Sequence, residues 1–154
     1  MNNAGILPYI VKDGQCKILL GKEKGKWSTF SGKQEETESF ETTALREFHE
    51  ETAHTFPFVT DAFFNRNAKG YMDSTTPAGK VIRLYFVNFS ECTEQELSTE
   101  AFVTNRDIST SPYEKEKTEL RRVELEQASS LKLRYCFYKD LVRIKNLITK
   151  IKNI

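Results

Sequence analysis

Acidic side chains in one stretch, residues 32–54, have the spacing of a metal site. Glu47, Glu50 and Glu51 lie at i, i+3 and i+4, directly after Arg46. On an α-helix these positions share an arc of ~100°, where like charges repel by roughly 0.2–0.5 kcal/mol per pair. A hard divalent cation would turn this cost into a gain, because carboxylate oxygens bind Mg²⁺ or Mn²⁺ and share it with phosphate groups. The spacing therefore predicts a metal centre that handles phosphates.

The same pattern also fits a simpler structure. A glutamate-rich helix with Leu45 and Phe48 on one side is usually a solvated amphipathic helix. Two neighbouring features favour the metal site instead. Gly32 precedes the helix at a fixed distance, and Trp27 begins a short predicted strand that leads into the glycine loop. We therefore expect the acidic face of the helix to bind a cation.

Residues 32–54 resemble the signature of the Nudix hydrolases, Gly-x5-Glu-x7-Arg-Glu-U-x-Glu-Glu-x-Gly-U, in which U is an apolar residue. The matching residues are Gly32, Glu38, Arg46, Glu47, Phe48, Glu50 and Glu51. Two positions depart from the pattern, because Ala53 stands in place of the second glycine and His54 in place of the last apolar residue. The resemblance implies an α/β/α sandwich with a mixed β-sheet between helices.

The resemblance also implies a role for each matching residue. Glu47, Glu50 and Glu51 correspond to the carboxylates that hold the metal, Mg²⁺ or Mn²⁺. Gly32 corresponds to the loop glycine whose backbone completes the metal site, where the lack of a Cβ permits close approach. Glu38 and Arg46 match the pair that braces the loop against the helix, a task for which a guanidinium fork suits better than an ammonium.

The general base is not fixed by the signature. Members of the family use either a glutamate of the signature or one from a later loop or strand. Glu114, Glu116 and Glu119 precede a predicted strand, and we favour Glu119 because it lies closest to the strand edge. A solvated charge run is the simpler interpretation of any one of them. The predicted catalytic residues are Arg46, Glu47, Glu50 and Glu119.

The sequence indicates substrate-binding residues less clearly than it indicates metal ligands. We predict that Lys33 and Arg83 bind phosphate oxygens, and we favour Lys33 because it adjoins the metal loop. Lys22 and Lys26 fit a solvated turn better. The aromatic residues that could stack on a nucleobase are Tyr9, Phe86 and Tyr113, of which the first two fit core packing better.

Ala53 falls just beyond the helix end, where a positive φ angle is common. Alanine adopts this conformation at a cost of about 1 kcal/mol, a penalty on stability that leaves every metal ligand in place. We therefore expect an active enzyme.

Length and composition favour one domain, residues 1–154, with a sizeable core. The net charge is +1, which gives no general attraction to nucleic acid or to anionic membranes. No apolar run approaches the ~20 residues of a membrane span. Cys16, Cys92 and Cys136 are widely spaced, which favours reduced thiols and a cytoplasmic protein over disulfides or zinc. The sequence carries no signal for an oligomeric state.

Periodicity and turn signals predict the elements that hold the acidic helix, itself expected over residues 39–52. Strands are expected at 4–11, 16–20, 27–30, 81–89 and 121–125, with a β-rich run at 57–64 and a charged turn at 21–26. We expect a hairpin connection with room for a short strand at 65–80 and an exposed loop with short pieces of structure at 90–112. A C-terminal amphipathic helix is expected over 138–151.

These observations predict a metal-dependent pyrophosphohydrolase. Its substrate would be a nucleoside diphosphate linked to another moiety, such as a second nucleotide, a dinucleoside polyphosphate or a sugar. Two alternatives remain. One is hydrolysis at the 5′ end of RNA, which the basic residues between Lys22 and Lys33 and in the C-terminal helix would serve. The other is a nucleotide-binding module without catalysis, which Ala53 and His54 suggest and the intact glutamates oppose.

Overall fold

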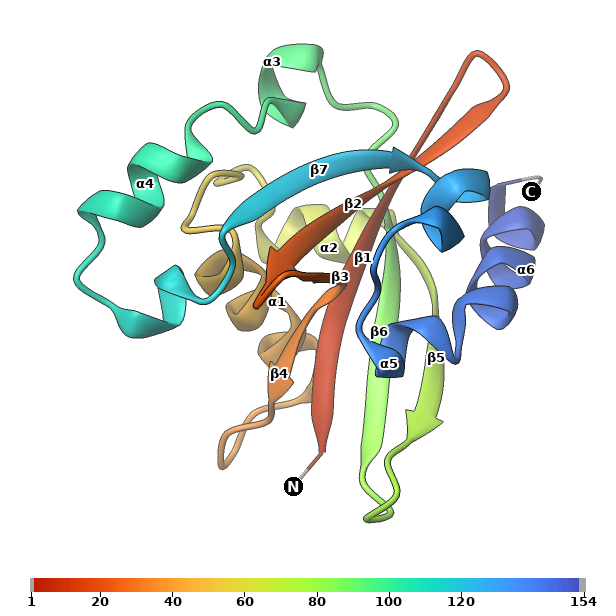
Figure 1. Ribbon diagram of the computed structural model, residues 1–154, viewed down its shortest axis with the longest axis horizontal. Coiled ribbons are helices and arrows are strands. Elements are labelled where there is room, and N and C mark those ends of the chain that lie inside the picture. The colour runs from red at the N-terminus through yellow and green to blue at the C-terminus, as the bar shows by residue number, and fades with distance from the viewer. Residues whose placement is uncertain (1, 153–154) are drawn as a thin grey trace.

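Within residues 2–152, which are those that the computed structural model describes, a seven-stranded mixed β-sheet forms the frame (Figure 1). Residues 1 and 153–154 of the expected domain lie outside the described residues. The strands are β1 (Asn3–Lys12), β2 (Gln15–Glu23), β3 (Lys26–Ser28), β4 (Phe30–Lys33), β5 (Ala68–Thr75), β6 (Val81–Asn88) and β7 (Glu119–Glu124). The α-helices are α1 (Phe40–Glu51), α2 (Asp61–Asn67), α3 (Glu94–Leu97), α4 (Phe102–Ile108), α5 (Tyr135–Tyr138) and α6 (Leu141–Lys152). Two 3₁₀ helices, η1 (Pro112–Lys115) and η2 (Leu125–Ser130), flank β7.

Strand β1 organises the sheet, whose order is β3-β2-β1-β6-β5. It pairs antiparallel with β2 and β4 and parallel with β6. Strand β7 joins the sheet by pairing antiparallel with β2. The consequence for the site is direct: β4, which carries Gly32, and β2, which ends at Glu23, both lie beside β1.

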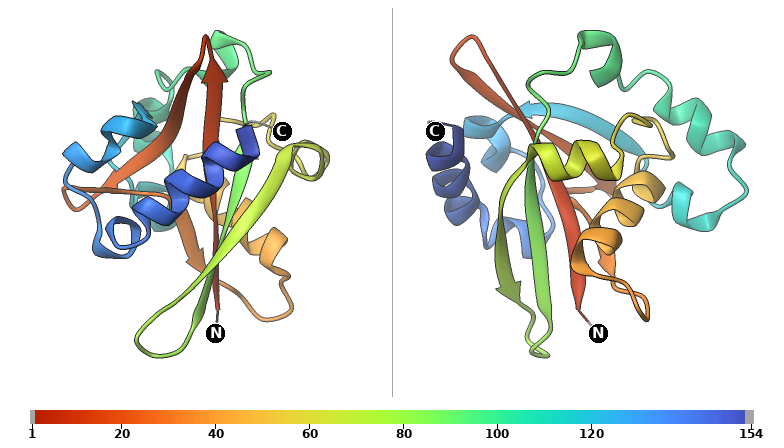
Figure 2. Two further views of the ribbon diagram at one scale, coloured as in Figure 1. Left: turned by 90° about the vertical axis from the view of Figure 1, so that its right-hand side faces the viewer. Right: turned by 180° about the vertical axis from the view of Figure 1, so that it is seen from behind.

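Helices cover both faces of the sheet (Figure 2). On one face, α1 and α2 pack over a cluster that includes Phe30, Phe48 and Phe89. On the other, α6 packs over a cluster that includes Trp27 and Ile148. The α/β/α sandwich with a mixed sheet, expected from the sequence, is therefore confirmed.

Helix α1 begins and ends close to the predicted bounds. Ser39 is its N-cap and accepts a hydrogen bond from the Thr42 amide, 3.1 Å away. Beyond the last turn, Ala53 and His54 have φ angles of 48° and 54°, so the expected left-handed conformation at Ala53 is confirmed. The amides of Ala53 and His54 close the helix by donating to the carbonyls of Glu50 and His49.

The β-rich run predicted at 57–64 is wrong, because no strand forms over these residues, all of which the structure describes. Helix α2 begins at Asp61, and the Thr60 hydroxyl caps it by accepting from the Phe63 amide. The aromatic residues that resembled a strand instead pack edge to face around Phe89, including Phe58 and Phe63. Aromatic enrichment here reflects tertiary packing rather than strand pairing.

Two more segments hold more structure than predicted. The 65–80 connection contains β5, a full strand of eight residues paired with β6. The 90–112 loop contains α3 and α4, which bury Leu97 and Phe102. The charged turn predicted at 21–26 is shorter than expected, because β2 continues to Glu23. Within residues 2–152, every helix is too short or too polar to serve as a membrane span.

Candidate metal-binding active site

Glycine at position 32 brings β4 into contact with the acidic face of α1. A Cβ atom on Gly32 would overlap the carboxylate of Glu47. Any larger residue would therefore displace Glu47 or separate the strand from the helix. The close approach that the sequence predicts for Gly32 is present, and it brings the Glu47 carboxylate against the backbone of the loop.

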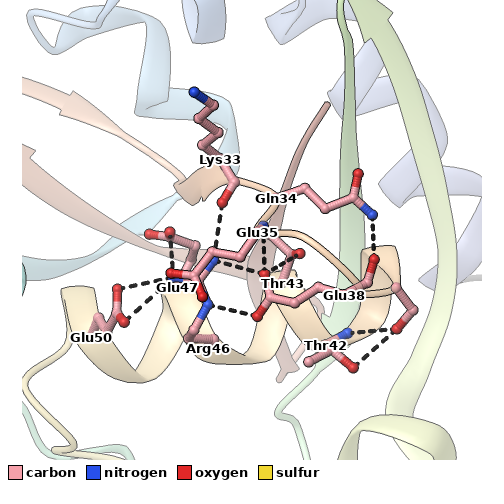
Figure 3. A network of polar contacts seen from close by, with 10 residues as sticks. Lys33, Gln34, Glu35, Glu38, Thr42, Thr43, Arg46, Glu47 and Glu50 are labelled. Carbon is pink, nitrogen blue, oxygen red and sulfur yellow. Dashed lines mark hydrogen bonds and ion pairs between the residues drawn. The ribbon is translucent and has the colours of Figure 1, made fainter. Parts of the chain in front are cut away.

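Arg46 organises the loop that joins β4 to α1 (Figure 3). Its Nε and Nη2 atoms donate to the two carboxylate oxygens of Glu38, at 2.8 and 2.9 Å. Glu38 also accepts from the Glu35 amide at 2.8 Å and from the Thr43 hydroxyl at 2.9 Å. The bond to Arg46 is the main reason that the pKa of Glu38 falls to about 2. Glu38 is thus ionised, and it braces the loop against α1 as its place in the signature implies.

The rest of the Arg46 guanidinium faces the carboxylates of Glu47 and Glu50. Nη1 donates to Glu47 at 2.9 Å and lies 3.3 Å from Glu50 Oε2, while Nη2 donates to the Lys33 carbonyl at 3.0 Å. One cation therefore lowers the repulsion among Glu38, Glu47 and Glu50 and ties the loop to the helix.

A second group of carboxylates lies deeper. Glu51 is 4% exposed, and carboxylate oxygens of Glu23, Glu51 and Glu116 lie within 4.8 Å of one another. The Oε1 atom of Glu51 is buried and has no hydrogen-bond partner among the described residues. Burial raises the pKa of Glu51 well above its ordinary value. A buried, partnerless carboxylate oxygen is costly unless an ion or a water satisfies it.

This donor set fits a hard divalent cation. The potential metal ligands that converge here are all carboxylates, and the described residues bring no cysteine or histidine into the cluster. Oxygen ligands of this kind suit Mg²⁺ and Mn²⁺. The residues that would hold such ions are Glu23, Glu47, Glu50, Glu51 and Glu116.

A surface pocket of about 350 Å³ opens beside the Arg46 network. Its walls include Lys33, Glu35, Arg46, Glu47, Glu50 and Tyr113. The Lys33 side chain extends away from the carboxylates (Figure 3), and Tyr113 is 60% exposed. The aromatic ring and the ammonium therefore offer stacking and phosphate contacts at the rim of an acidic centre. Tyr9 and Phe86, by contrast, are buried in the core.

Glu119 lies away from the cluster. It pairs with Lys22 in the ladder between β2 and β7, and its carboxylate accepts from Arg121 at 2.9 Å. Because side chains alternate along a strand, Glu119 and Arg121 share the face opposite Leu120, which packs in the core beneath α1. Glu116, three residues earlier, is the glutamate that the structure brings close to Glu23 and Glu51.

Arg83 also lies outside the pocket. Its guanidinium is bonded to Asp73 at 2.8 and 2.9 Å and stacks between the rings of Phe40 and Tyr71, with its central carbon 4.4 and 4.0 Å from the ring centroids. These contacts occupy the charge of Arg83 within the protein.

Four residues near the cluster escaped the sequence analysis as site residues: Glu23, Glu116, Lys117 and Arg134. Arg134 lies 3.9 Å from Glu23, and Lys117 lies 3.7 Å from it. Glu116 was visible only as one member of a charge run. The others are brought in by strand pairing across nearly the whole chain, for which the sequence gives no local signal.

His54 links the end of α1 to η1. Its ring stacks on that of His49 with a centroid distance of 5.8 Å, and its Nε2 atom lies 3.5 Å from Glu114. The departure from an apolar residue at this position thus replaces packing by a polar contact, which lies near Tyr113 and Glu116.

Comparison with known proteins agrees with the geometry. A family model described as the NUDIX domain matches residues 2–141. The Nudix hydrolase RenU from M. smegmatis has a similar structure, with a TM-score of 0.67, 16% identity, and coverage of 97% of this chain and 87% of that one. An Ap4A hydrolase from C. elegans has a TM-score of 0.63, 16% identity, and coverage of 97% and 99%.

The NUDIX domain of Shewanella oneidensis NrtR, solved with ADP ribose, has a TM-score of 0.60 at 16% identity, over 96% of this chain and 88% of that chain. No curated protein matches the sequence closely enough to count as a relative. At these identities the solved structures support the fold, whereas the family model spans most of the chain and includes every residue of the acidic centre. The chain belongs to the Nudix hydrolase family.

Proposed function

We propose that the protein is a metal-dependent pyrophosphohydrolase that cleaves the diphosphate bridge of a nucleoside diphosphate linked to another moiety. The observation that carries the proposal is the convergence of the Glu23, Glu51 and Glu116 carboxylates, one of which, Glu51, is buried with a partnerless Oε1 atom. A divalent cation would offset the repulsion among these carboxylates and the cost of burying one of them. Mg²⁺ or Mn²⁺ is the proposed cofactor.

The bound cation would neutralise phosphate charge and lower the pKa of a water molecule, the chemistry that anhydride hydrolysis requires. The protein supplies the positioning. Arg46 holds Glu47 and Glu50 in place despite their mutual repulsion. We propose that Lys33, which lines the pocket, and Arg134, which lies 3.9 Å from Glu23, contact phosphate oxygens. For the general base we favour Glu116 over Glu119, because the Glu116 carboxylate belongs to the cluster and reaches solvent.

The solved relatives suggest where to begin with substrates. One is named as an Ap4A hydrolase and another was solved with ADP ribose. Both ligands join adenosine to another group through phosphoric anhydride bonds. We therefore propose a nucleotide of this class, bound with its base near Tyr113 and its phosphates over Glu47 and Glu50.

A substrate panel tests the proposal. The pure protein is incubated with Ap4A, ADP ribose, nucleotide sugars, nucleoside triphosphates and 5′-capped RNA, each with Mg²⁺, with Mn²⁺ or with EDTA. We expect metal-dependent release of a nucleoside monophosphate from at least one small molecule. Turnover of the RNA alone would assign the activity to RNA 5′ ends. Unchanged nucleotide binding in EDTA, with no product under any condition, would identify a binding module.

We also propose that the whole chain, residues 1–154, acts as one domain in the cytoplasm. Elements from β1 to α6 pack on the same sheet. Cys16, Cys92 and Cys136 are free, a state that a reducing compartment maintains. Cell fractionation with an antibody to the protein would test the location.

A further inference from the structure

Lys117 is a lysine buried beside the metal-binding carboxylates. It is 1% exposed, whereas lysine is almost never buried unless it is paired. Its Nζ atom donates to the Ser28 hydroxyl at 2.9 Å and to the Thr29 carbonyl at 3.3 Å. The same atom lies 3.7 Å from a carboxylate oxygen of Glu23. The ammonium is therefore fixed in place by strand β3 and the residue after it, at the edge of the acidic cluster.

Strand β2 leaves room for this side chain. A Cβ atom on Gly21 would lie 2.9 Å from Cδ of Lys117 and 2.9 Å from the ring of Phe30. The Phe30 ring centroid is 5.8 Å from the ammonium, within the range of a cation–π contact. Gly21 has no side chain, and this leaves a space that the Phe30 ring lines and Lys117 fills. The fold therefore accommodates Lys117 in its buried position.

The positive charge of Lys117 balances part of the negative charge of the cluster. Glu23, Glu51 and Glu116 bring three carboxylates together, while Arg46 directs its ion pairs to Glu35, Glu38, Glu47 and Glu50 instead. Arg134 also approaches Glu23, but its side chain is 47% exposed, so solvent screens its charge. Within residues 2–152, Lys117 is the buried cation at this cluster.

We propose that Lys117 is a resident cation of the Glu23–Glu51–Glu116 cluster. Its ammonium holds the carboxylates together when no metal is bound, and it opposes a divalent ion that enters the cluster. The first statement stands on the geometry alone. The second rests on the proposed function, because it requires that the cluster bind metal.

The two statements predict that removing the ammonium destabilises the metal-free protein and strengthens the binding of metal. Without metal, Lys117→Met leaves the buried Glu51 carboxylate and its two neighbours with no buried counter-charge, which is strongly destabilising. With metal, the divalent ion replaces the missing charge and no longer meets a positive neighbour. Binding to the folded state raises its stability, so the metal should stabilise the variant more than the parent. A lysine that only fills space would lower stability equally under both conditions.

The test is thermal unfolding of full-length variants in EDTA and in Mn²⁺. In EDTA, we expect Lys117→Met to unfold roughly 10 °C below the parent. Lys115→Met is the matched control, because Lys115 is exposed two residues away, and it should change the midpoint by no more than about 2 °C. Equal midpoints for Lys117→Met and the parent in EDTA would overturn the proposal.

A double variant separates pairing from packing. In the parent, Glu23→Gln removes a partner of Lys117 and should lower the midpoint in EDTA. In the Lys117→Met background, the same substitution removes one of the repelling charges and should raise the midpoint. A decrease of the same size in both backgrounds would overturn the pairing of these residues.

Metal addition completes the design. We expect Mn²⁺ to raise the midpoint of Lys117→Met several degrees more than that of the parent, and to permit folding if the variant is unfolded in EDTA. An equal shift in both proteins would overturn the opposition between Lys117 and the metal. The absence of any shift in any variant would overturn the proposed metal dependence, while the Glu23→Gln comparison in EDTA would still decide the role of Lys117.

Discussion

Arg46 is the residue on which the acidic loop depends. Its Nε and Nη2 atoms donate to Glu38, Nη2 also donates to the Lys33 carbonyl, and Nη1 donates to Glu47 and Glu50. A lysine could place its single charge near one of these groups but could not bridge them, because its donors radiate from one atom. The arginine in the signature is therefore explained by the number and spread of its acceptors.

Removing the charge of a proposed metal ligand tests the role of the helix face. Glu50→Gln and Glu51→Gln keep the size of the side chain and its helix propensity, but lose the charge that the cation needs. We expect a loss of at least ~100-fold in turnover, measured with Mg²⁺ on the best substrate of the panel. Glu41→Gln, in the first turn of α1, is the control and should remain within about two-fold of the parent. Equal activities of all three variants would show that the acidic face is only solvated.

The Glu38–Arg46 pair should make stability depend on acid. The folded-state pKa of Glu38 is lowered from 4.5 to about 2, so the pair contributes stability above pH 4.5 that is lost as pH falls towards 2. Glu38→Gln should lower the unfolding midpoint at pH 7 by about 3–6 °C and reduce the loss between pH 5 and pH 2. Glu36→Gln, an exposed neighbour, should keep the acid dependence of the parent. Thermal unfolding monitored by circular dichroism across this range measures both effects.

Local spacing explains which site residues could be predicted. Glu47, Glu50 and Glu51 are adjacent on one helix turn, so the sequence alone brings them together. Glu23 and Lys117 are separated by most of the chain and meet only through the register of β2 and β7, which pairs Lys22 with Glu119. A shift of one residue would have turned Glu119 towards α1, and the sequence does not specify that register.

Among the elements, α1 shows how a helix end is closed without the usual glycine. Ala53 takes a φ angle of 48°, and its amide still donates to the Glu50 carbonyl at 3.1 Å. The strain of the left-handed conformation is offset by packing, because Ala53 is 3% exposed within the core beneath α1. The departure from the signature thus affects the end of the helix and leaves its acidic face unchanged.

Two alanine-to-glycine substitutions, one within α1 and one just beyond its end, isolate this strain. Ala44 and Ala53 are both buried, so each change to glycine removes the same methyl group. Ala44→Gly should destabilise by about 1–2 kcal/mol, because it also weakens the helix interior. Ala53→Gly should cost about 1 kcal/mol less, because it relieves the positive φ, and its turnover should stay within a few-fold of the parent. Urea unfolding measures the difference, and equal losses would mean that Ala53 carries no strain.

Elements were predicted well where local signals agree with tertiary packing. Strand β6 is a nearly continuous apolar run, and α1 has a capping serine and a clear period, so both could be predicted. Helix α2 was missed because its phenylalanines raise strand propensity, although Thr60 and Asp61 are helix-start residues. Strand β5 is polar and is stabilised by pairing with β6, a contact that its own sequence does not reveal.

At the scale of the molecule, the sheet separates two hydrophobic cores that have different structural roles. The core under α1 and α2 supports the acidic centre, while the core under α6 closes the opposite face. The fold class could be predicted from the order of the elements. The residues that make up each hydrophobic core, however, depend on which face of the sheet each strand residue occupies. Alternation along β7 illustrates it, since Leu120 packs in the first core and Val123 in the second.

This separation predicts that stability and catalysis can be changed independently. Ile148 on α6 is fully buried in the second core, so Ile148→Ala should destabilise by about 2–4 kcal/mol. The acidic centre lies on the other face, so turnover of the folded variant at low temperature should remain within about two-fold of the parent. Val142→Ala, at a 73% exposed position of the same helix, should change stability by no more than about 0.5 kcal/mol. A large fall in turnover for Ile148→Ala while circular dichroism reports a folded protein would show instead that the two faces are coupled through the sheet.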